Sequence, residues 1–243
     1  MEKLHMGTMG WSYDFWKGNL YPEGSEHLLT EYAKNFDTVE INTTFYRIPS
    51  RNTVRKWTEE TPDGFIFSAK LPRKITHVKR LQDCQEEFEV FLEHMSLLGN
   101  KRGPMLIQLP PGFVPEMSGT LNDFLADLPE GRFAVEVRNK KWLDEKFYGL
   151  LREHAVALVL LDHPWMPEMN MITADFTYIR WAGDRKKVKG TLGTVEKDRR
   201  KEIKDWAVKI KGFLDDSVEV FGYFSKYYSG YPPGDVRMLS DSM

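Results

Sequence analysis

The sequence predicts a TIM-type β/α barrel with a reduced or missing sixth crossover helix, formed as one domain over residues 1–243. Its length is close to the roughly 250 residues typical of one such barrel. Short apolar runs alternate with segments of helical period, which is the pattern of βαβ units and a parallel sheet. The apolar runs number eight, which is the count of strands that closes this barrel.

Each apolar run is expected to form one strand. The expected strands cover residues 4–9, 38–41, 65–69, 105–109, 133–137, 156–161, 176–181 and 218–224. Apolar stripes at helical spacing fall in the first, second, third, fourth and seventh connections, and Ser25 and Ser50 are expected to cap the first two helices. The sixth connection contains Pro164 and Pro167 and no such stripe, so no helix is expected there. The Tyr-, Gly- and Pro-rich tail after Phe224 is expected to lie over the barrel end.

Composition narrows the function classes. Lysine plus arginine nearly balance aspartate plus glutamate, giving a net charge of −2, which argues against a globally basic nucleic-acid binder but leaves local patches open. Cys84 is the single cysteine, so neither an intramolecular disulfide nor a thiolate metal cage is expected. The first residues lack the apolar stretch of a signal peptide, and no run reaches the length of a membrane span. A cytoplasmic protein without membrane contact is the expectation.

Polar side chains recur at the C-terminal ends of the expected strands. Strands of such a barrel are buried on both faces, so charges at these ends are informative, and TIM-barrel enzymes place their chemistry there. The residues are Glu40, Asn42, Lys70, Gln108, Glu136, Arg138, Asp162 and Arg180. Because an isolated buried ion costs several kcal/mol, pairing among them is expected. Two hypotheses follow: a functional site at the mouth, or a self-neutralising network that merely closes the barrel.

Glu40, Glu136 and Lys70 are the candidate catalytic residues. Two carboxylates in one partly dry pocket can hold different pKa values, so that one serves as acid and the other as base. The alternative is that each glutamate only pairs with a neighbouring cation. Lys70 could form a Schiff base or simply hold an anion. Arg138 and Arg180 offer planar donors suited to carboxylate or phosphate, which favours an anionic substrate.

Residues in the expected loops complete the candidate substrate site. His77 lies in the basic stretch 73–80 and is a candidate general acid or phosphate contact, or part of a solvated loop. Trp11, Tyr13 and Tyr46 follow the first two strands and could stack on a sugar or base, or simply pack the mouth. The six histidines are scattered without ligand spacing, so no metal or other cofactor is expected.

Five motifs in order carry a family resemblance: GTMGWSY at 7–13, TVEINTTFY at 38–46, ITH at 75–77, QLPP at 108–111 and AVEVR at 134–138. With them, nearly the whole chain resembles the domain-of-unknown-function-72 family, the YecE-like proteins. The resemblance implies a TIM-type barrel and no assigned reaction. The chain departs from the family pattern at YFSK (223–226), where relatives usually have Tyr-Phe-Asn-Asn and where Lys226 could add a positive charge to the mouth. It departs again at RWAG (180–183), where relatives often have Arg-x-His-Gly.

Two functional hypotheses remain open. The first is an enzyme, a hydrolase or lyase, that uses acid/base or hydrolytic chemistry on a small anionic or carbohydrate-like substrate. The second is a nucleic-acid-binding or nuclease-like barrel, supported by basic stretches at 73–80, 185–189 and 197–201. A binding barrel without turnover is a third, less specific possibility. Substrate, reaction and oligomeric state are not determined by the sequence.

Overall fold

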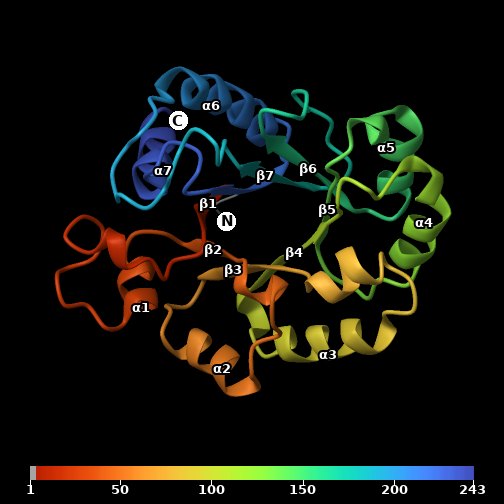
Figure 1. Ribbon diagram of the computed structural model, residues 1–243, viewed down its shortest axis with the longest axis horizontal. Coiled ribbons are helices and arrows are strands. Elements are labelled where there is room, and N and C mark those ends of the chain that lie inside the picture. The colour runs from red at the N-terminus through yellow and green to blue at the C-terminus, as the bar shows by residue number, and fades with distance from the viewer. Residues whose placement is uncertain (1–3) are drawn as a thin grey trace.

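Eight parallel strands form a closed barrel in sequence order (Figure 1), and the predicted TIM-type fold is confirmed. The computed structural model describes residues 4–243; residues 1–3 of the predicted domain lie outside that range. The first strand pairs with the last, from Leu4 beside Val220 to Thr8 beside Phe224, which closes the ring. Because all eight pairings are parallel, the C-terminal ends of all eight strands meet at one mouth of the closed barrel.

The strands coincide closely with the predicted apolar runs. They are β1 (Leu4–Met9), β2 (Thr38–Ile41), β3 (Ile66–Lys70), β4 (Arg102–Gln108), β5 (Phe133–Glu136), β6 (Ala157–Asp162), β7 (Phe176–Trp181) and β8 (Glu219–Phe224). The start of β4 was the least predictable, because Arg102, Gly103 and Pro104 are poor strand formers. A Cβ at Gly103 would lie 2.5 Å from Ile66 Cγ2, so the close approach of β3 requires a glycine there.

Seven α-helices surround the barrel in the described part of the chain (Figure 1). They are α1 (Leu28–Ala33), α2 (Arg51–Glu59), α3 (Gln85–Ser96), α4 (Ser118–Ala126), α5 (Glu145–Glu153), α6 (Arg200–Asp215) and α7 (Pro232–Asp241). Residues 163–175, between β6 and β7, contain no helix, as predicted from the two prolines. Ser50 caps α2 by accepting a hydrogen bond from the Thr53 amide at 3.1 Å, also as predicted.

Three local predictions need correction. Helix α1 begins at Leu28, so its N-cap position is His27, which makes no side-chain cap, and Ser25 lies two residues too early to cap it. Helix α5 was not predicted, because it buries only Phe147 and Leu151 and so shows little of an apolar stripe, although Asp144 caps it. The tail was expected over the barrel end: Ser225, Lys226 and Tyr227 do line the mouth, but α7 packs on the outer wall against β1, β8 and α6.

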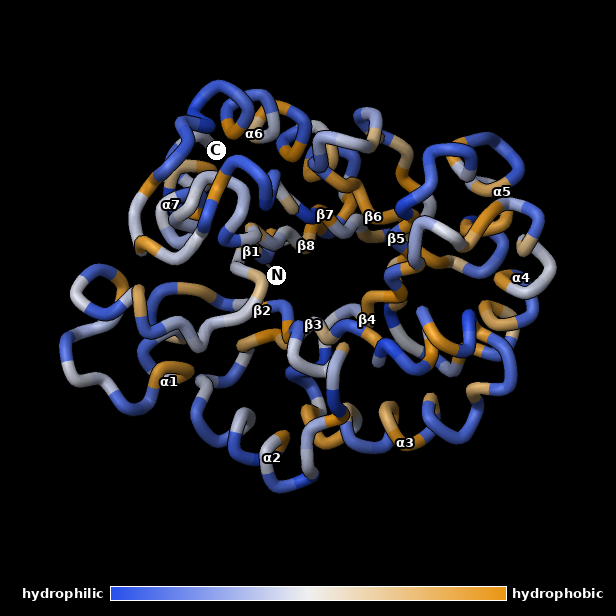
Figure 2. Tube along the Cα trace, in the orientation of Figure 1, coloured by the Kyte–Doolittle hydropathy of each residue, from blue (hydrophilic) through white to orange (hydrophobic). Residues whose placement is uncertain are grey.

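The barrel interior changes from apolar to polar toward the mouth. An apolar inner cluster includes Leu106, Val159, Phe176 and Phe221. Above it, Tyr223 Oη lies 2.8 Å from Thr38 Oγ1 and 2.7 Å from Ser68 Oγ. Figure 2 shows hydrophobic segments along the strands and largely hydrophilic outer loops. None of the helices within residues 4–243 has the length and hydrophobicity needed to cross a bilayer.

Candidate functional site: a cationic pocket at the barrel mouth

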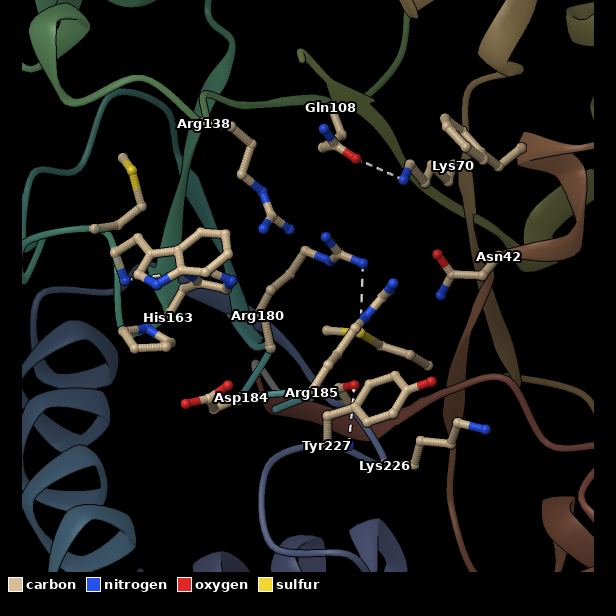
Figure 3. A pocket seen from close by; sticks show the side chains of 18 of the residues that line it. Asn42, Lys70, Gln108, Arg138, His163, Arg180, Asp184, Arg185, Lys226 and Tyr227 are labelled. Atoms are coloured by element: carbon tan, nitrogen blue, oxygen red, sulfur yellow. Dashed lines mark hydrogen bonds between the residues drawn. The ribbon is translucent and has the colours of Figure 1, made fainter. Parts of the chain in front are cut away.

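A cavity of about 740 Å³ opens at the C-terminal end of the barrel. Its walls come from the ends of the strands and from the loops that follow all eight of them (Figure 3). The predicted site residues that line it are Tyr13, Asn42, Tyr46, Lys70, His77, Gln108, Arg138 and Arg180. The fold therefore brings most of the predicted site into one space.

Arg180, the fifth residue of β7, forms the centre of the floor. Its Nε and Nη2 donate to the two carboxylate oxygens of Glu40 at 2.8 and 2.9 Å, and its Nη1 donates to Glu136 Oε2 at 2.5 Å. Both glutamates are 0% exposed. Burial alone would lower the pKa of Arg180, but Glu136 and Glu40 outweigh it and raise that pKa above its ordinary value. The guanidinium is thus a permanent charge that binds both acids.

The remaining carboxylate oxygen positions are also satisfied. Asn42 Nδ2 donates to Glu40 Oε1 at 2.5 Å, and Tyr178 Oη donates to Glu40 Oε2 at 2.9 Å. Arg138 Nε donates to Glu136 Oε1. Burial would raise the pKa of Glu136, but Arg138 and Arg180 outweigh burial and lower that pKa to about 2. Glu40 and Glu136 were predicted to transfer protons. Both carboxylates lie buried beneath the cavity, where their oxygens accept hydrogen bonds from Arg180 and its neighbours and hold the arginines in place.

Lys70 ends β3 and lines the cavity while being only 8% exposed. Its Nζ donates to Gln108 Oε1 at 2.6 Å (Figure 3) and lies 3.8 Å from the centre of the Phe45 ring. The Gln108 amide is itself fixed, because its Nε2 donates to the Leu109 carbonyl at 2.8 Å. Burial and the neighbouring Arg180 lower the pKa of Lys70 to about 7. Lys70 is therefore an amine that can change protonation near neutral pH.

His77 lies on a π-helical turn, residues Lys74–Val78, directly after β3. Such turns occur frequently at functional sites. The His77 ring packs edge-on against Phe45 at 4.9 Å, and its Nδ1 is 2.9 Å from Thr76 Oγ1. Burial and the charge of Lys70 lower the pKa of His77 to about 4, so the imidazole is neutral at neutral pH.

The outer wall adds basic side chains, and the sequence analysis suggested only Lys226 among them. Loops after β7 and β8 bring Arg185, Lys186 and Lys226 to the rim, and Arg73 lines the opposite side. The two loops pack tightly at Gly183, where a Cβ would lie 2.0 Å from the Tyr227 carbonyl oxygen. The backbone of Gly183 also has a positive φ of +67°. The basic stretch at 185–189 had been noted, but its approach to the mouth depends on this loop contact. Lys226 at the mouth follows the suggestion made from its position after β8.

The lining carries a strong excess of positive charge. Among the described residues that form it, seven are basic and one, Asp184, is acidic. The basic residues are Lys70, Arg73, Arg138, Arg180, Arg185, Lys186 and Lys226. Asp184 is engaged in its own loop, where its Oδ1 accepts from the Lys186 amide at 2.9 Å. The cavity is therefore suited to an anion.

Two aromatic side chains stand exposed at the rim. Tyr46, after β2, is 82% exposed, and Trp165, in the helix-free connection after β6, is 71% exposed. Both line the cavity. Trp165 was not predicted as a site residue; a solitary tryptophan in a proline-containing loop was the available signal. Exposed aromatic faces at a pocket rim can stack on a flat or sugar ring.

Two predicted site residues lie elsewhere. Asp162 points to the outside of the barrel, where its Oδ2 accepts from Trp206 Nε1 at 3.0 Å and from Tyr228 Oη at 3.3 Å. Trp11 packs against Trp57 and Phe67, at ring distances of 5.6 and 6.5 Å. Neither lines the cavity. Within residues 4–243 no group of three or more His, Cys, Asp or Glu side chains is placed to hold a metal ion.

Fold and site together define a TIM-type barrel protein with a cationic pocket at its mouth. The family model described as a protein of unknown function, DUF72, matches residues 5–243, and the chain belongs to this family. It is 33% identical over 165 residues to YecE of Escherichia coli (strain K12). The aligned stretch covers 65% of this chain and 59% of YecE, which is less than two thirds of that protein. It is 26% identical over 261 residues to YunF of Bacillus subtilis (strain 168), covering 93% and 90%.

The solved structure of a DUF72 protein from Thermotoga maritima is also similar. It superposes with a TM-score of 0.79 at 26% identity, covering 98% of this chain and 96% of that one. These relatives support the barrel and the family, and their names state no activity.

Proposed function

We propose that this protein is an enzyme that acts on a small anionic substrate, with phosphate esters as the foremost class, bound in the pocket at the barrel mouth. The observation that carries the proposal is the charge of the lining: seven basic side chains face the cavity and the two glutamates are buried beneath it. Arginine forks and lysine ammonium groups are the usual protein partners of phosphate. A volume of about 740 Å³ lies within the range of small-molecule sites.

The acid/base role shifts to Lys70 and His77. Both line the cavity, and burial lowers the pKa of each, to about 7 and about 4. A general base works best with a pKa near the operating pH, which favours Lys70. Glu40 and Glu136 then act as positioning residues that hold Arg180 and Arg138 toward the substrate.

The nucleic-acid alternative has less support. All three of its basic stretches carry acid partners. Lys74 and Lys79 pair with Glu87, Lys187 pairs with Asp184, and Arg200 and Lys201 pair with Asp198 and Asp205. The basic side chains that surround one enclosed space are those of the pocket lining. The exposed rim aromatics could still stack on bases, so oligonucleotides belong in the test.

Calorimetric titration tests the proposal with glycerol 3-phosphate, glycerol and a single-stranded oligonucleotide. Glycerol 3-phosphate should bind and glycerol should not, and Arg185→Ala with Lys226→Ala should weaken the binding about tenfold, the loss expected when charged hydrogen bonds are removed. Arg200→Ala with Lys201→Ala, on α6 outside the pocket, removes the same charge; this matched control should bind like the unchanged chain. Absence of phosphate-ester binding, or preference for the oligonucleotide, would contradict the proposal.

A further inference from the structure

We propose that Lys70 is a nucleophile that forms an imine with a phosphorylated aldehyde or ketone held in the pocket. This inference rests on the proposed function, because the basic wall would hold the phosphate while Lys70 meets the carbonyl carbon. It narrows the substrate class from phosphate esters in general to those that also carry a carbonyl group.

The surroundings of Lys70 Nζ carry the first part of the argument. Its contacts are the Gln108 amide oxygen at 2.6 Å and the Phe45 ring at 3.8 Å, and neither bears a charge. The described residues offer it no carboxylate at ion-pair distance, although the buried Glu136 and Glu40 are near enough to influence its charge. Those glutamates are bound by the two arginines. A lysine needed only to neutralise them would pair with one of them.

The position of Lys70 carries the second part. Three lysines line the cavity, and Lys70 alone among them is buried and set on a strand, whereas Lys186 and Lys226 lie on loops. Lys186 Nζ lies 5.5 Å from the Trp165 ring and Lys226 Nζ lies 5.4 Å from the Tyr13 ring. Figure 3 shows Lys70 and Gln108 on one side of the space, with the Arg138, Arg180 and Arg185 side chains reaching into it. A substrate held by these arginines would face the Lys70 amine.

The hydrogen bond to Gln108 suits a neutral amine as well as an ammonium ion. Because Gln108 Nε2 is held by the Leu109 carbonyl, its Oε1 stays turned toward Lys70 and accepts an N–H from either form. In the neutral form this contact holds one N–H on Gln108 and so restricts the orientation of the nitrogen lone pair. A fraction of Lys70 is neutral near pH 7, as its lowered pKa requires.

The chemical step balances without an oxidant or a cofactor. The lone pair of Lys70 Nζ attacks the carbonyl carbon, the C=O π electrons move to oxygen, and that oxygen takes up the proton which nitrogen loses, giving a carbinolamine. The C–O bond then breaks, the hydroxyl group leaves as water with the second nitrogen proton, and a C=N bond forms. Borohydride supplies hydride to that carbon and converts the imine into a stable secondary amine.

Three related probes test the inference on the full chain. Pyridoxal 5′-phosphate carries an aldehyde, a phosphate and a flat ring; pyridoxine 5′-phosphate has an alcohol in place of the aldehyde; pyridoxal lacks the phosphate. Treatment with substoichiometric pyridoxal 5′-phosphate and borohydride should place one label on the chain, and peptide mass mapping should locate it at Lys70. Pyridoxal should label Lys70 about tenfold less, because it forgoes the charged phosphate contacts. Pyridoxine 5′-phosphate should compete without labelling.

Variants and outcomes separate this inference from the proposed function. Lys70→Arg should lose the label yet still bind pyridoxine 5′-phosphate, and Lys201→Arg, on α6, should keep the label. Binding of pyridoxine 5′-phosphate without label at Lys70, or label spread over surface lysines, overturns the imine and leaves the proposed function standing. Failure of pyridoxine 5′-phosphate to bind, with equal labelling of Lys70 by both aldehydes, overturns the anion site. If Lys70→Arg does not fold, the peptide map of the unchanged chain decides.

Discussion

Arg180 binds both buried acids of the barrel mouth, and its replacement would leave both without their shared partner. Removing one member of a buried ion pair leaves an uncompensated charge and costs roughly 3–5 kcal/mol. Arg180→Met should therefore lower the free energy of unfolding by about this amount in urea titrations. Arg185→Met, an exposed change at the same mouth, should stay within about 0.5 kcal/mol. Equal effects of the two changes would contradict the role assigned to Arg180.

Lys70 should make stability depend on pH in a defined direction. Its pKa is lowered from 10.5 to about 7 in the folded chain, so the unfolded chain binds more protons between these values. Stability therefore rises with pH across this window, and the cost of Lys70 is fully present below pH 7 and lost by about pH 10.5. The stability difference between Lys70→Met and the unchanged chain should shrink as pH rises from 7 to 10.5. Lys201→Met, which alters an exposed lysine, should show no such slope.

At the scale of elements, strand alternation explains which predicted residues reach the pocket. On β7 the side chains of Phe176, Tyr178 and Arg180 point into the barrel. On β6 the side chains of Ala157 and Val159 point inward, so alternation along the strand turns Asp162 outward. The sequence contained this parity, but the site prediction used only the nearness of Asp162 to the strand end. Trp11 is different: it follows the turn at Gly10, φ +88°, where strand alternation no longer applies.

The outward position of Asp162 leads to a test. Asp162→Ala removes the acceptor of Trp206 on α6 and of Tyr228 in the tail. Leaving these buried donors unpaired should lower the free energy of unfolding by about 1–3 kcal/mol. The affinity for glycerol 3-phosphate should not change, and calorimetry would detect a change if Asp162 belonged to the binding site. Asp162→Asn keeps an acceptor oxygen and should have the smaller effect on stability.

The loop after β7 reaches the pocket through the close contact at Gly183. A Cβ there would clash with the Tyr227 carbonyl, and the backbone is in the left-handed region. Gly183→Ala should therefore displace Arg185 and Lys186 and weaken phosphate-ester binding. Gly119→Ala on α4 is the matched control, since a Cβ there meets nothing within 4 Å, and it should be neutral or stabilising by up to about 1 kcal/mol. Equal binding by both variants would contradict this dependence on Gly183.

At the scale of the molecule, the barrel was predictable because its pattern is local and repeated, whereas the charge of the pocket was not. Strand runs such as 38–41 and 176–181 coincide with β2 and β7 because burial on both faces leaves a continuous apolar signal. The mouth loops carry no such period. Arg185 and Lys186 reach the cavity only because Gly183 packs on the loop after β8, a contact between distant parts of the chain. The polar strand ends were therefore found, while Trp165 and most of the basic rim were missed.

The contrast between the net charge of the chain and the charge of its mouth leads to a prediction for the whole molecule. The net charge is −2, yet the mouth is strongly basic, so local rather than net charge should govern binding. Lys186→Gln with Lys226→Gln should weaken glycerol 3-phosphate binding about tenfold at low salt, and the difference should narrow as salt screens the exposed charges. Arg200→Gln with Lys201→Gln removes the same charge from α6 and should have no effect. Equal weakening by the two double variants would mean that the protein's overall field, and not the pocket, attracts the anion.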